Sequence, residues 1–323
     1  VLPPLQSLDV VFVPASPLIG NVQIDGFSAA HPKWKHTSTA SWYGDLGSLS
    51  LRWRYIGKMG KTNELADFAL LIEYIAEIPG VERIRFTTSH PKEFTQRLID
   101  VYAKVPKLVS HLHLPVQHAS DSVLSAMKRG YTVLEFKSII RRMRAVRPDL
   151  CLSSDFIVGF PGETEEDFLE TMRVAELARF TAAFTFQYSQ RPGTPAAELP
   201  DQLPKEIVQE RYERLLALVN DIAWQENKKL VGKSAEVLVA NNEGRKDSQT
   251  NRLSGRARDN RLVHFEVPDG ANPRPGDLVT VTITDAAPYH LLADLSSEQE
   301  FSIRMTRAGD AWDAAEAASC ATP

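Results

Sequence analysis

The stretch from residue 150 to residue 178, LCLSSDFIVGFPGETEEDFLETMRVAELA, decides the fold of this chain. Residues 150–160 are largely apolar, as a strand in a sheet that is buried on both faces requires. A turn with Gly159 and Gly162 follows, and residues 163–178 predict a helix with acidic side chains in its first turn, where they suit the helix dipole. A strand, a glycine-containing turn and a helix in this order predict one unit of a parallel α/β sheet.

The same alternation of helices and strands extends on both sides of this stretch. Further strands are predicted at residues 82–91, 108–117 and 181–189. Helices are predicted at residues 64–78, 92–105, 121–130, 133–146 and 205–231, with Thr132 as the N-cap of the fourth. Roughly four β/α units therefore precede residue 230. Parallel strands with right-handed crossovers are expected, in either a doubly wound sheet or a β/α barrel.

The pattern changes after Gly232. Short alternating segments, separated by polar or Gly/Pro turns, occur at residues 234–240, 252–257, 261–267, 278–284 and 289–295. They predict a small all-β barrel of about five strands. We therefore divide the chain into an unassigned stretch at 1–54, which has no sustained period, an α/β domain at 55–230, a β-barrel at 231–295, and a tail at 296–323 that is expected to be frayed.

Composition and charge set limits on the function. The chain has 323 residues, of which 43% are hydrophobic and 24% charged, and a net charge of −4, so any basic surface for nucleic acid must be local. No apolar run approaches the roughly 18–20 residues of a membrane span. The apolar start carries no basic leader and does not resemble a signal peptide, so a cytoplasmic location is expected. Two cysteines, Cys151 and Cys320, cannot supply a site with three or four cysteine ligands within one copy of the chain.

Polar residues follow each of the four predicted parallel strands. They are TTSHP at 87–91, PVQHASD at 115–121, GFPGET at 159–164 and YSQRPGT at 188–194. Each alone could be a helix cap or a tight turn. Because active sites of parallel β/α folds collect at the carboxyl ends of the strands, the four together predict a polar rim for a ligand such as a nucleoside with an amino-acid tail. The turn glycines would let backbone amides approach that ligand.

These motifs carry a family resemblance. TTSHP, LPVQHASDSVLSAMKRGYT, SSDFIVGFPGETEEDF and YSQRPGTPAA, in this order and spacing, resemble the carboxy-terminal half of the barrel of the radical-SAM methylthiotransferases of the MiaB type. The resemblance covers about residues 55–295. It implies an α/β fold, a partial radical-SAM (β/α) barrel, followed by an all-β, OB-like TRAM barrel that binds RNA.

The resemblance also implies an activity. Such enzymes bind S-adenosylmethionine on a 4Fe-4S cluster, cleave it to a 5′-deoxyadenosyl radical, use a second cluster in sulfur insertion, and methylthiolate the isopentenylated adenosine next to the anticodon of tRNA. Electrons come from a partner such as flavodoxin or ferredoxin. No residue is assigned as catalytic. By the same resemblance, Arg191 faces substrate or phosphate, and the cofactor-binding residues are Ser89, His90, Gln117, Ser120, Asp155, Gly159 and Glu163.

The chain departs from the family at its cluster motif. CxxxCxxC should fall somewhat before residue 55, and that region contains no cysteine. We therefore expect no radical chemistry from this chain alone, and no metal ligands are predicted. Five histidines could in principle bind metal, but for His111 and His113, which alternate on one face of a strand, a core or edge role is expected; the others are His31, His36 and His118.

The RNA-binding prediction rests on local charge. Residues 228–261 hold nine basic residues against four acidic ones, the footprint expected for phosphate contacts. GRARDNRLVHFEV at 255–267 resembles the TRAM domain, and the predicted RNA contacts are Lys246, Arg256, Arg258, Asn260 and Arg261. Three alternatives stay open: a methylthiotransferase for an aspartate of a ribosomal protein, a non-catalytic tRNA-binding remnant, and an unrelated barrel enzyme. An open sheet edge also predicts marginal stability or dimerisation of the isolated chain.

Overall fold

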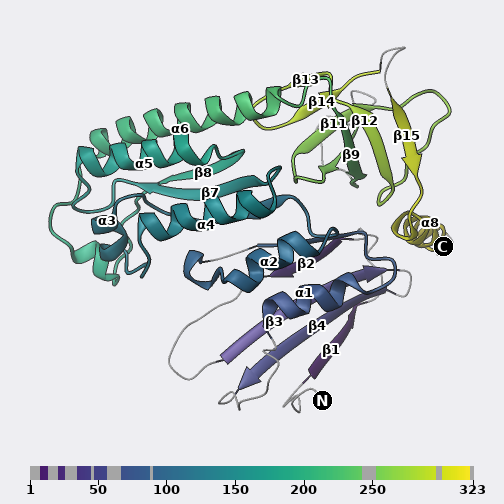
Figure 1. The fold of residues 1–323 in the computed structure, drawn as a ribbon, viewed down its shortest axis with the longest axis horizontal. Coiled ribbons are helices and arrows are strands. Elements are labelled where there is room, and N and C mark those ends of the chain that lie inside the picture. The colour runs from purple at the N-terminus through teal and green to yellow at the C-terminus, as the bar shows by residue number, and fades with distance from the viewer. Residues whose placement is uncertain are drawn as a thin grey trace.

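A parallel sheet forms the centre of the fold (Figure 1). The computed structural model describes residues 8–13, 21–25, 35–44, 47–56, 67–87, 90–241, 252–295 and 300–320. Within them β6 (His111–His113), β7 (Cys151–Val158) and β8 (Ala182–Gln187) pair in parallel in the order β6-β7-β8. The strand β5 (Arg83–Phe86) continues this series through a parallel bridge between Ile84 and Leu108. The four predicted strands are thus parallel and lie in sequence order, which favours barrel winding over a doubly wound sheet.

Helices connect these strands, and two of them begin at a capping box. The predicted N-cap Thr132 is confirmed, because its Oγ1 accepts a hydrogen bond from the Glu135 amide at 3.2 Å while the Glu135 carboxylate accepts one from the Thr132 amide at 2.7 Å. Thr164 and Asp167 form a second capping box. The helices of this part are α1 (Phe68–Ala76), α2 (Gln96–Lys104), α3 (Asp121–Ala126), α4 (Val133–Val146), α5 (Glu165–Ala178) and α6 (Lys205–Lys228), with 3₁₀ turns at Pro91–Glu93 and Pro195–Glu198.

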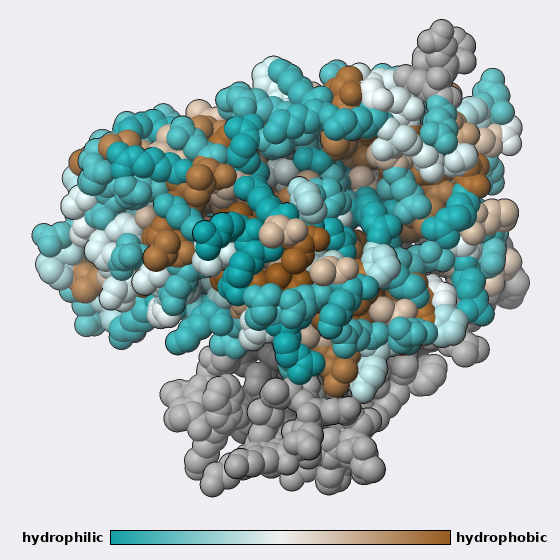
Figure 2. Space-filling view, in the orientation of Figure 1, coloured by the Kyte–Doolittle hydropathy of each residue, from teal (hydrophilic) through white to brown (hydrophobic). Residues whose placement is uncertain are grey.

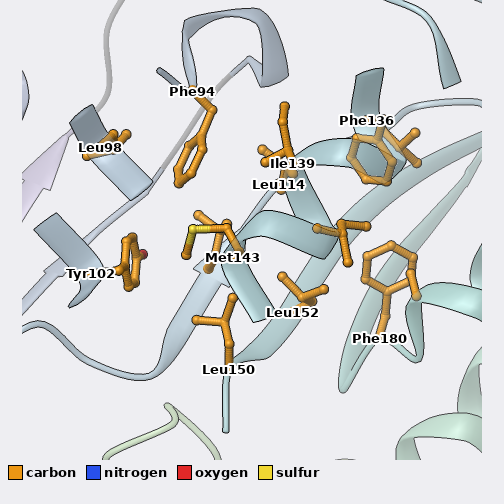
Figure 3. Close-up of a cluster of buried hydrophobic side chains, with 14 of the residues drawn as sticks. Phe94, Leu98, Tyr102, Leu114, Phe136, Ile139, Met143, Leu150, Leu152 and Phe180 are labelled. Carbon is orange, nitrogen blue, oxygen red and sulfur yellow. The ribbon is translucent and has the colours of Figure 1, made fainter. Parts of the chain in front are cut away.

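The larger core lies between the parallel sheet and the helices (Figure 3). Alternation along β7 directs Leu152, Phe156 and Val158 into this core, where all three are buried. Each fully buried side chain of this size contributes roughly 1.5–3 kcal/mol. Other buried members include Leu98 and Tyr102 of α2, Phe136, Ile139 and Met143 of α4, and Phe168 of α5. The opposite face of the sheet is not part of this core.

A second sheet of seven strands follows α6. Its order is β13-β14-β11-β10-β9-β12-β15, and its neighbours are antiparallel except for β11 and β14. The strands are β9 (Ser234–Val239), β10 (Arg252–Ala257), β11 (Leu262–Glu266), β12 (Leu278–Thr282), β13 (Asp285–Ala286), β14 (Leu291–Ala293) and β15 (Phe301–Arg304). Sequence patterning predicted five strands. It missed the two-residue β13 and placed β15 in the tail.

The tail differs from its predicted frayed state. Besides β15 it contains α8 (Arg307–Cys320). Polar contacts hold its start: the Thr306 amide donates to Asp277 Oδ1 at 2.9 Å, and Arg274 Nη1 lies 3.0 Å from Asp310 Oδ1. These partners lie about 30 residues away along the chain, so local composition could not reveal them.

The stretch left unassigned at residues 1–54 also contains strands. The described ones are β1 (Leu8–Val13), β2 (Asn21–Asp25), β3 (Lys35–Gly44) and β4 (Gly47–Ile56), in a sheet of order β1-β4-β3-β2-β5. β2 pairs in parallel with β5, which joins this sheet to the central one. The face shown in Figure 2 is mostly hydrophilic, with small apolar patches between polar side chains. Among the described residues, no helix has the length and apolar character of a membrane span.

Candidate functional site

The face of the parallel sheet opposite the helices carries a polar network, which we call the inner face and define by His111, His113, Ser153, Asp155 and Phe184. Ser153 Oγ lies 3.1 Å from His111 Nε2 and 2.9 Å from His113 Nδ1. His113 Nε2 in turn lies 3.6 Å from Asp155 Oδ1. The Phe184 ring meets the His113 ring edge to face at a centroid distance of 6.1 Å. The predicted pairing of His111 and His113 on one face is therefore present, with a serine between them.

Burial sets the charge of this network. It lowers the pKa of His111 to about 3, helped by the nearby positive charge of Arg85. His111 is therefore neutral at neutral pH. One hydroxyl can donate only one proton, so at least one of the two imidazoles must donate to Ser153 Oγ. His113 and Asp155 keep part of their side chains exposed, 16% and 26%, so this end of the network is accessible to a ligand.

Gln117 and Asp155, both predicted cofactor-binding residues, are brought together by the backbone. The Gln117 amide donates to the Asp155 carbonyl at 2.9 Å, and the Ile157 amide donates to the Gln117 carbonyl at 2.7 Å. Gln117 has φ +67°, in the left-handed region that costs a non-glycine residue energy. The two strand ends predicted to form one rim are thus directly bonded.

Gly159 and Glu163 fix the next turn. Gly159 has φ +78°, and a Cβ there would lie 2.6 Å from Val208 Cγ1 of α6, so only glycine fits. Its amide donates to Glu163 Oε2 at 2.8 Å. The Glu163 carboxylate is fully buried, and Arg211 Nη1 lies 2.8 Å from its Oε1. The contacts of Glu163 hold the turn in place; its predicted contact with a cofactor stays a prediction.

Ser120 and His118 extend this buried group. The Ser120 amide donates to His118 Nδ1 at 3.1 Å, so the imidazole proton sits on Nε2, which donates to Glu163 Oε2 at 3.2 Å. Ser120 Oγ donates to the Asp167 carboxylate. Burial opposes ionisation of Asp167, but the hydrogen bonds from Ser120 and Thr164 outweigh it and lower its pKa to about 2. His118, considered as a metal ligand from the sequence, is instead committed to Glu163.

The remaining predicted rim residues lie apart from this group. His90 caps the 3₁₀ turn at Pro91–Glu93, its Nδ1 accepting from the Lys92 amide at 3.2 Å, and its ring lies 5.3 Å from that of Tyr131. Burial lowers the pKa of His90, and Arg129 adds to this effect. Arg191 is exposed in its turn, where the Thr194 hydroxyl donates to its carbonyl at 2.7 Å. Ser89 lies outside the described residues.

The basic hairpin predicted to contact RNA packs against the amino-terminal ends of the parallel strands. The Ser110 amide donates to the Arg258 carbonyl at 3.2 Å, and Arg83 Nη1 donates to the Arg256 carbonyl at 2.8 Å. The Arg258 guanidinium donates to the Pro106 carbonyl. The hairpin therefore connects the seven-stranded sheet to the parallel sheet.

Two further hairpin residues are also engaged. Arg261 pairs with Asp259, whose Oδ2 accepts from the thiol of Cys151 at 3.5 Å. Asn260 makes the turn with φ +69°. Four of the predicted RNA contacts lie in the described residues, and of these only Arg258 is exposed, while Arg256, Asn260 and Arg261 are partly buried. Lys246 lies outside the described residues. An RNA role for these residues stays a prediction, whereas the docking contacts are present.

The residues present do not fit an iron–sulfur cluster. The whole chain has two cysteines, and burial, together with the nearby Asp259, raises the pKa of the Cys151 thiol to about 12, which disfavours the thiolate a cluster needs. Within the described ranges, no three His, Cys, Asp or Glu side chains gather as a metal site.

Comparisons with known proteins connect this site to a family. The Radical SAM superfamily matches residues 52–175. The tRNA-2-methylthio-N(6)-dimethylallyladenosine synthase of Nocardioides sp. is 57% identical over 251 residues, which cover 78% of this chain and 50% of that protein. The synthase of the same name from Polynucleobacter asymbioticus is 61% identical over 242 residues, 75% of this chain and 53% of that protein. The chain thus spans about half the length of the curated relatives it matches.

Among solved structures, coproporphyrinogen III oxidase from Escherichia coli resembles the chain with a TM-score of 0.41 and 15% identity, covering 49% of this chain and 38% of that one.

Proposed function

We propose a function from the family to which this chain belongs, the radical-SAM methylthiotransferases, of whose length it spans about half. In this proposal the chain is the part of a tRNA methylthiotransferase that receives the target nucleoside and grips the RNA. β5 to β8 with their helices are part of the radical-SAM (β/α) barrel. The seven-stranded sheet is the TRAM domain.

One observation carries the proposal. The 57% identity to a named tRNA synthase coincides with polar groups at the carboxyl edge of sequentially ordered parallel strands. There Gln117 bonds to Asp155 of the neighbouring strand, and Gly159 bonds to Glu163 within the next turn. That edge is where parallel β/α folds bind ligands. The partly exposed Asp155 and the positive φ of Gln117 at this edge support the proposal.

The proposed reaction is methylthiolation of N6-dimethylallyladenosine next to the anticodon, with S-adenosylmethionine, 4Fe-4S clusters and an electron donor such as flavodoxin or ferredoxin. The 323 residues do not fit the clusters, because two cysteines cannot hold three irons. We therefore assign binding, and no radical step, to this chain by itself. The named tRNA synthases favour this substrate over a ribosomal protein.

Two measurements test the proposal. Fluorescence anisotropy with an anticodon stem-loop RNA should show binding that weakens as salt rises, and a stem-loop of unrelated sequence should bind more weakly. Anaerobic reconstitution with iron and sulfide should leave the chain without stoichiometric iron. Absence of RNA binding contradicts the assigned partner. About four irons per chain, with a visible absorption band that responds to S-adenosylmethionine, contradicts the binding-only role.

A further inference from the structure

Two phenyl rings on β8 are exposed to solvent, although large apolar side chains on a strand are ordinarily buried. Phe184 is 54% exposed and Phe186 is 51% exposed. Alternation places both on the same side of β8, while Ala183 on the other side packs into the core, where α6 covers the strand (Figure 1). Neighbouring exposed apolar side chains can form a binding surface.

Polar groups border these rings on one side. In the register of β7 and β8, Phe184 lies opposite Asp155 and Phe186 lies opposite Ile157. The His113 ring touches Phe184, and its Nε2 lies 3.6 Å from Asp155 Oδ1. The surface thus combines an apolar area with a carboxylate and an imidazole, both partly exposed.

This combination limits the ligand. Phenyl rings stack on flat heterocycles and cover aliphatic groups, and a carboxylate accepts a hydrogen bond from an exocyclic N–H. An adenine with an N6-dimethylallyl group has all three features: a flat ring, one remaining N6–H, and a branched apolar substituent. S-adenosylmethionine carries no apolar branch, and its charged tail suits the polar strand ends better than two phenyl rings.

We infer that Phe184 and Phe186, with Asp155 and His113, form the site that selects the N6-dimethylallyl adenine of the substrate. The inference rests on the proposed function and assigns its base-recognition site. The phenyl rings cover the dimethylallyl group and the base, and Asp155 accepts the N6–H. His113 positions Asp155 and faces the base edge.

The site should give a measurable preference for the modified base. Transfer of a five-carbon apolar group from water to a half-exposed phenyl surface is worth roughly a tenfold to hundredfold gain in affinity. The test compares two anticodon stem-loop RNAs that differ only in the dimethylallyl group, by fluorescence anisotropy with the complete 323-residue chain. We expect the modified RNA to bind about tenfold or more tightly.

Variants test whether the two phenyl rings cause the preference for the modified RNA. Phe184→Ser combined with Phe186→Ser should remove this preference, because it weakens the binding of the modified RNA more than that of the unmodified RNA. Phe186→Leu, which keeps apolar surface, should retain most of the preference. Leu177→Ser on α5 is the matched control, since Leu177 is also exposed, at 61%. Circular dichroism confirms that each variant is folded.

Each result decides the inference. The inference is supported if the preference disappears in the double variant and persists in the Phe186→Leu and Leu177→Ser variants. A preference that persists in the double variant overturns it, as does equal binding of both RNAs by the unmutated chain, which leaves the proposed function intact. Binding of neither RNA overturns both. If the unmutated chain binds S-adenosylmethionine in equilibrium dialysis and the double variant does not, the surface is a cofactor site and the inference is wrong.

Discussion

Arg83 Nη2 lies 2.9 Å from Glu236 Oε1, and this ion pair joins the parallel sheet to the seven-stranded sheet. The Arg83 side chain is almost completely buried, and it also donates to the carbonyls of Arg256 and Glu236. A single guanidinium thus satisfies three acceptors on two strands of the second sheet. The relative placement of the two sheets depends on this residue more than on any exposed pair around it.

Arg83→Met should therefore lower the free energy of unfolding by about 2–4 kcal/mol, because the buried guanidinium is removed from its ion pair and two carbonyls lose a donor. Urea denaturation followed by circular dichroism measures this loss. Arg304→Met is the control: Arg304 is 54% exposed and lies 3.7 Å from the same Glu236. The Arg304→Met variant should lose less than about 1 kcal/mol of unfolding free energy. Equal losses of unfolding free energy in the two variants would show that the Arg83–Glu236 pair contributes no more than an exposed pair.

Gly159→Ala should destabilise the chain more than Gly162→Ala. Both glycines have positive φ, +78° and +81°, so alanine is strained at either position. At Gly159 the new Cβ also meets Val208 Cγ1 at 2.6 Å, whereas nothing lies within 4 Å at Gly162. We expect a loss of about 1 kcal/mol for Gly162→Ala and about 2–4 kcal/mol for Gly159→Ala. Val208→Ala introduced into the Gly159→Ala chain should recover part of the difference in thermal melts; no recovery would exclude the clash with Val208 as the cause.

Ser120→Ala should raise the pKa of Asp167. Burial alone would raise this pKa, and the hydrogen bonds from Ser120 and Thr164 lower it from 3.8 to about 2. Because the folded-state pKa lies below the unfolded one, the stabilisation is present above pH 3.8 and disappears as the pH falls through about 2. An NMR titration of the Asp167 carboxyl carbon measures the shift. Ser125→Ala, an exposed position on α3, should leave the titration unchanged, and a similar shift there would contradict the role of Ser120.

Cys151 should react slowly with thiol reagents. Its thiol is buried, and burial raises its pKa to about 12, so little thiolate exists at pH 8. In a Cys320→Ser chain, labelling of Cys151 by iodoacetamide should therefore be far slower than that of a free peptide thiol. Arg83→Met in this background should accelerate labelling, because undocking of the hairpin exposes the strand end where Cys151 lies. A rate unaffected by Arg83→Met would mean that the hairpin does not protect Cys151.

The elements that sequence patterns predicted are those that local rules determine. The strand at Cys151–Val158 and the helix from Glu165 are visible because apolar runs, turn glycines and capping residues are all local. The closeness of Gln117 and Asp155 follows from a fold-level rule, that parallel strands end at one edge. The motifs at 159–164 could place Glu163 in a turn, but its complete burial depends on Arg211 of α6, which is distant in sequence.

The docking of the basic hairpin was not predictable in this way. Arg256, Arg258 and Arg261 have the composition of an RNA-binding surface, and nothing in their spacing shows that Pro106 and Ser110 lie against them. The exposed pair Phe184 and Phe186 was missed for the opposite reason, since an alternating apolar strand normally predicts burial. In each case the outcome depends on which surfaces meet, a property of the whole fold and not of any short stretch.

The docked hairpin makes the two ends of the inner face different. It covers the strand ends at Ser110 and Cys151, while the opposite ends, at Gln117 and Gly159, carry the polar turns. One end of the inner face is therefore closed by the chain's own second sheet. A nucleotide in the proposed site would have to unstack and enter base first past the polar turns, while its phosphates stay outside. An unpaired loop could therefore bind, whereas a continuous duplex could not.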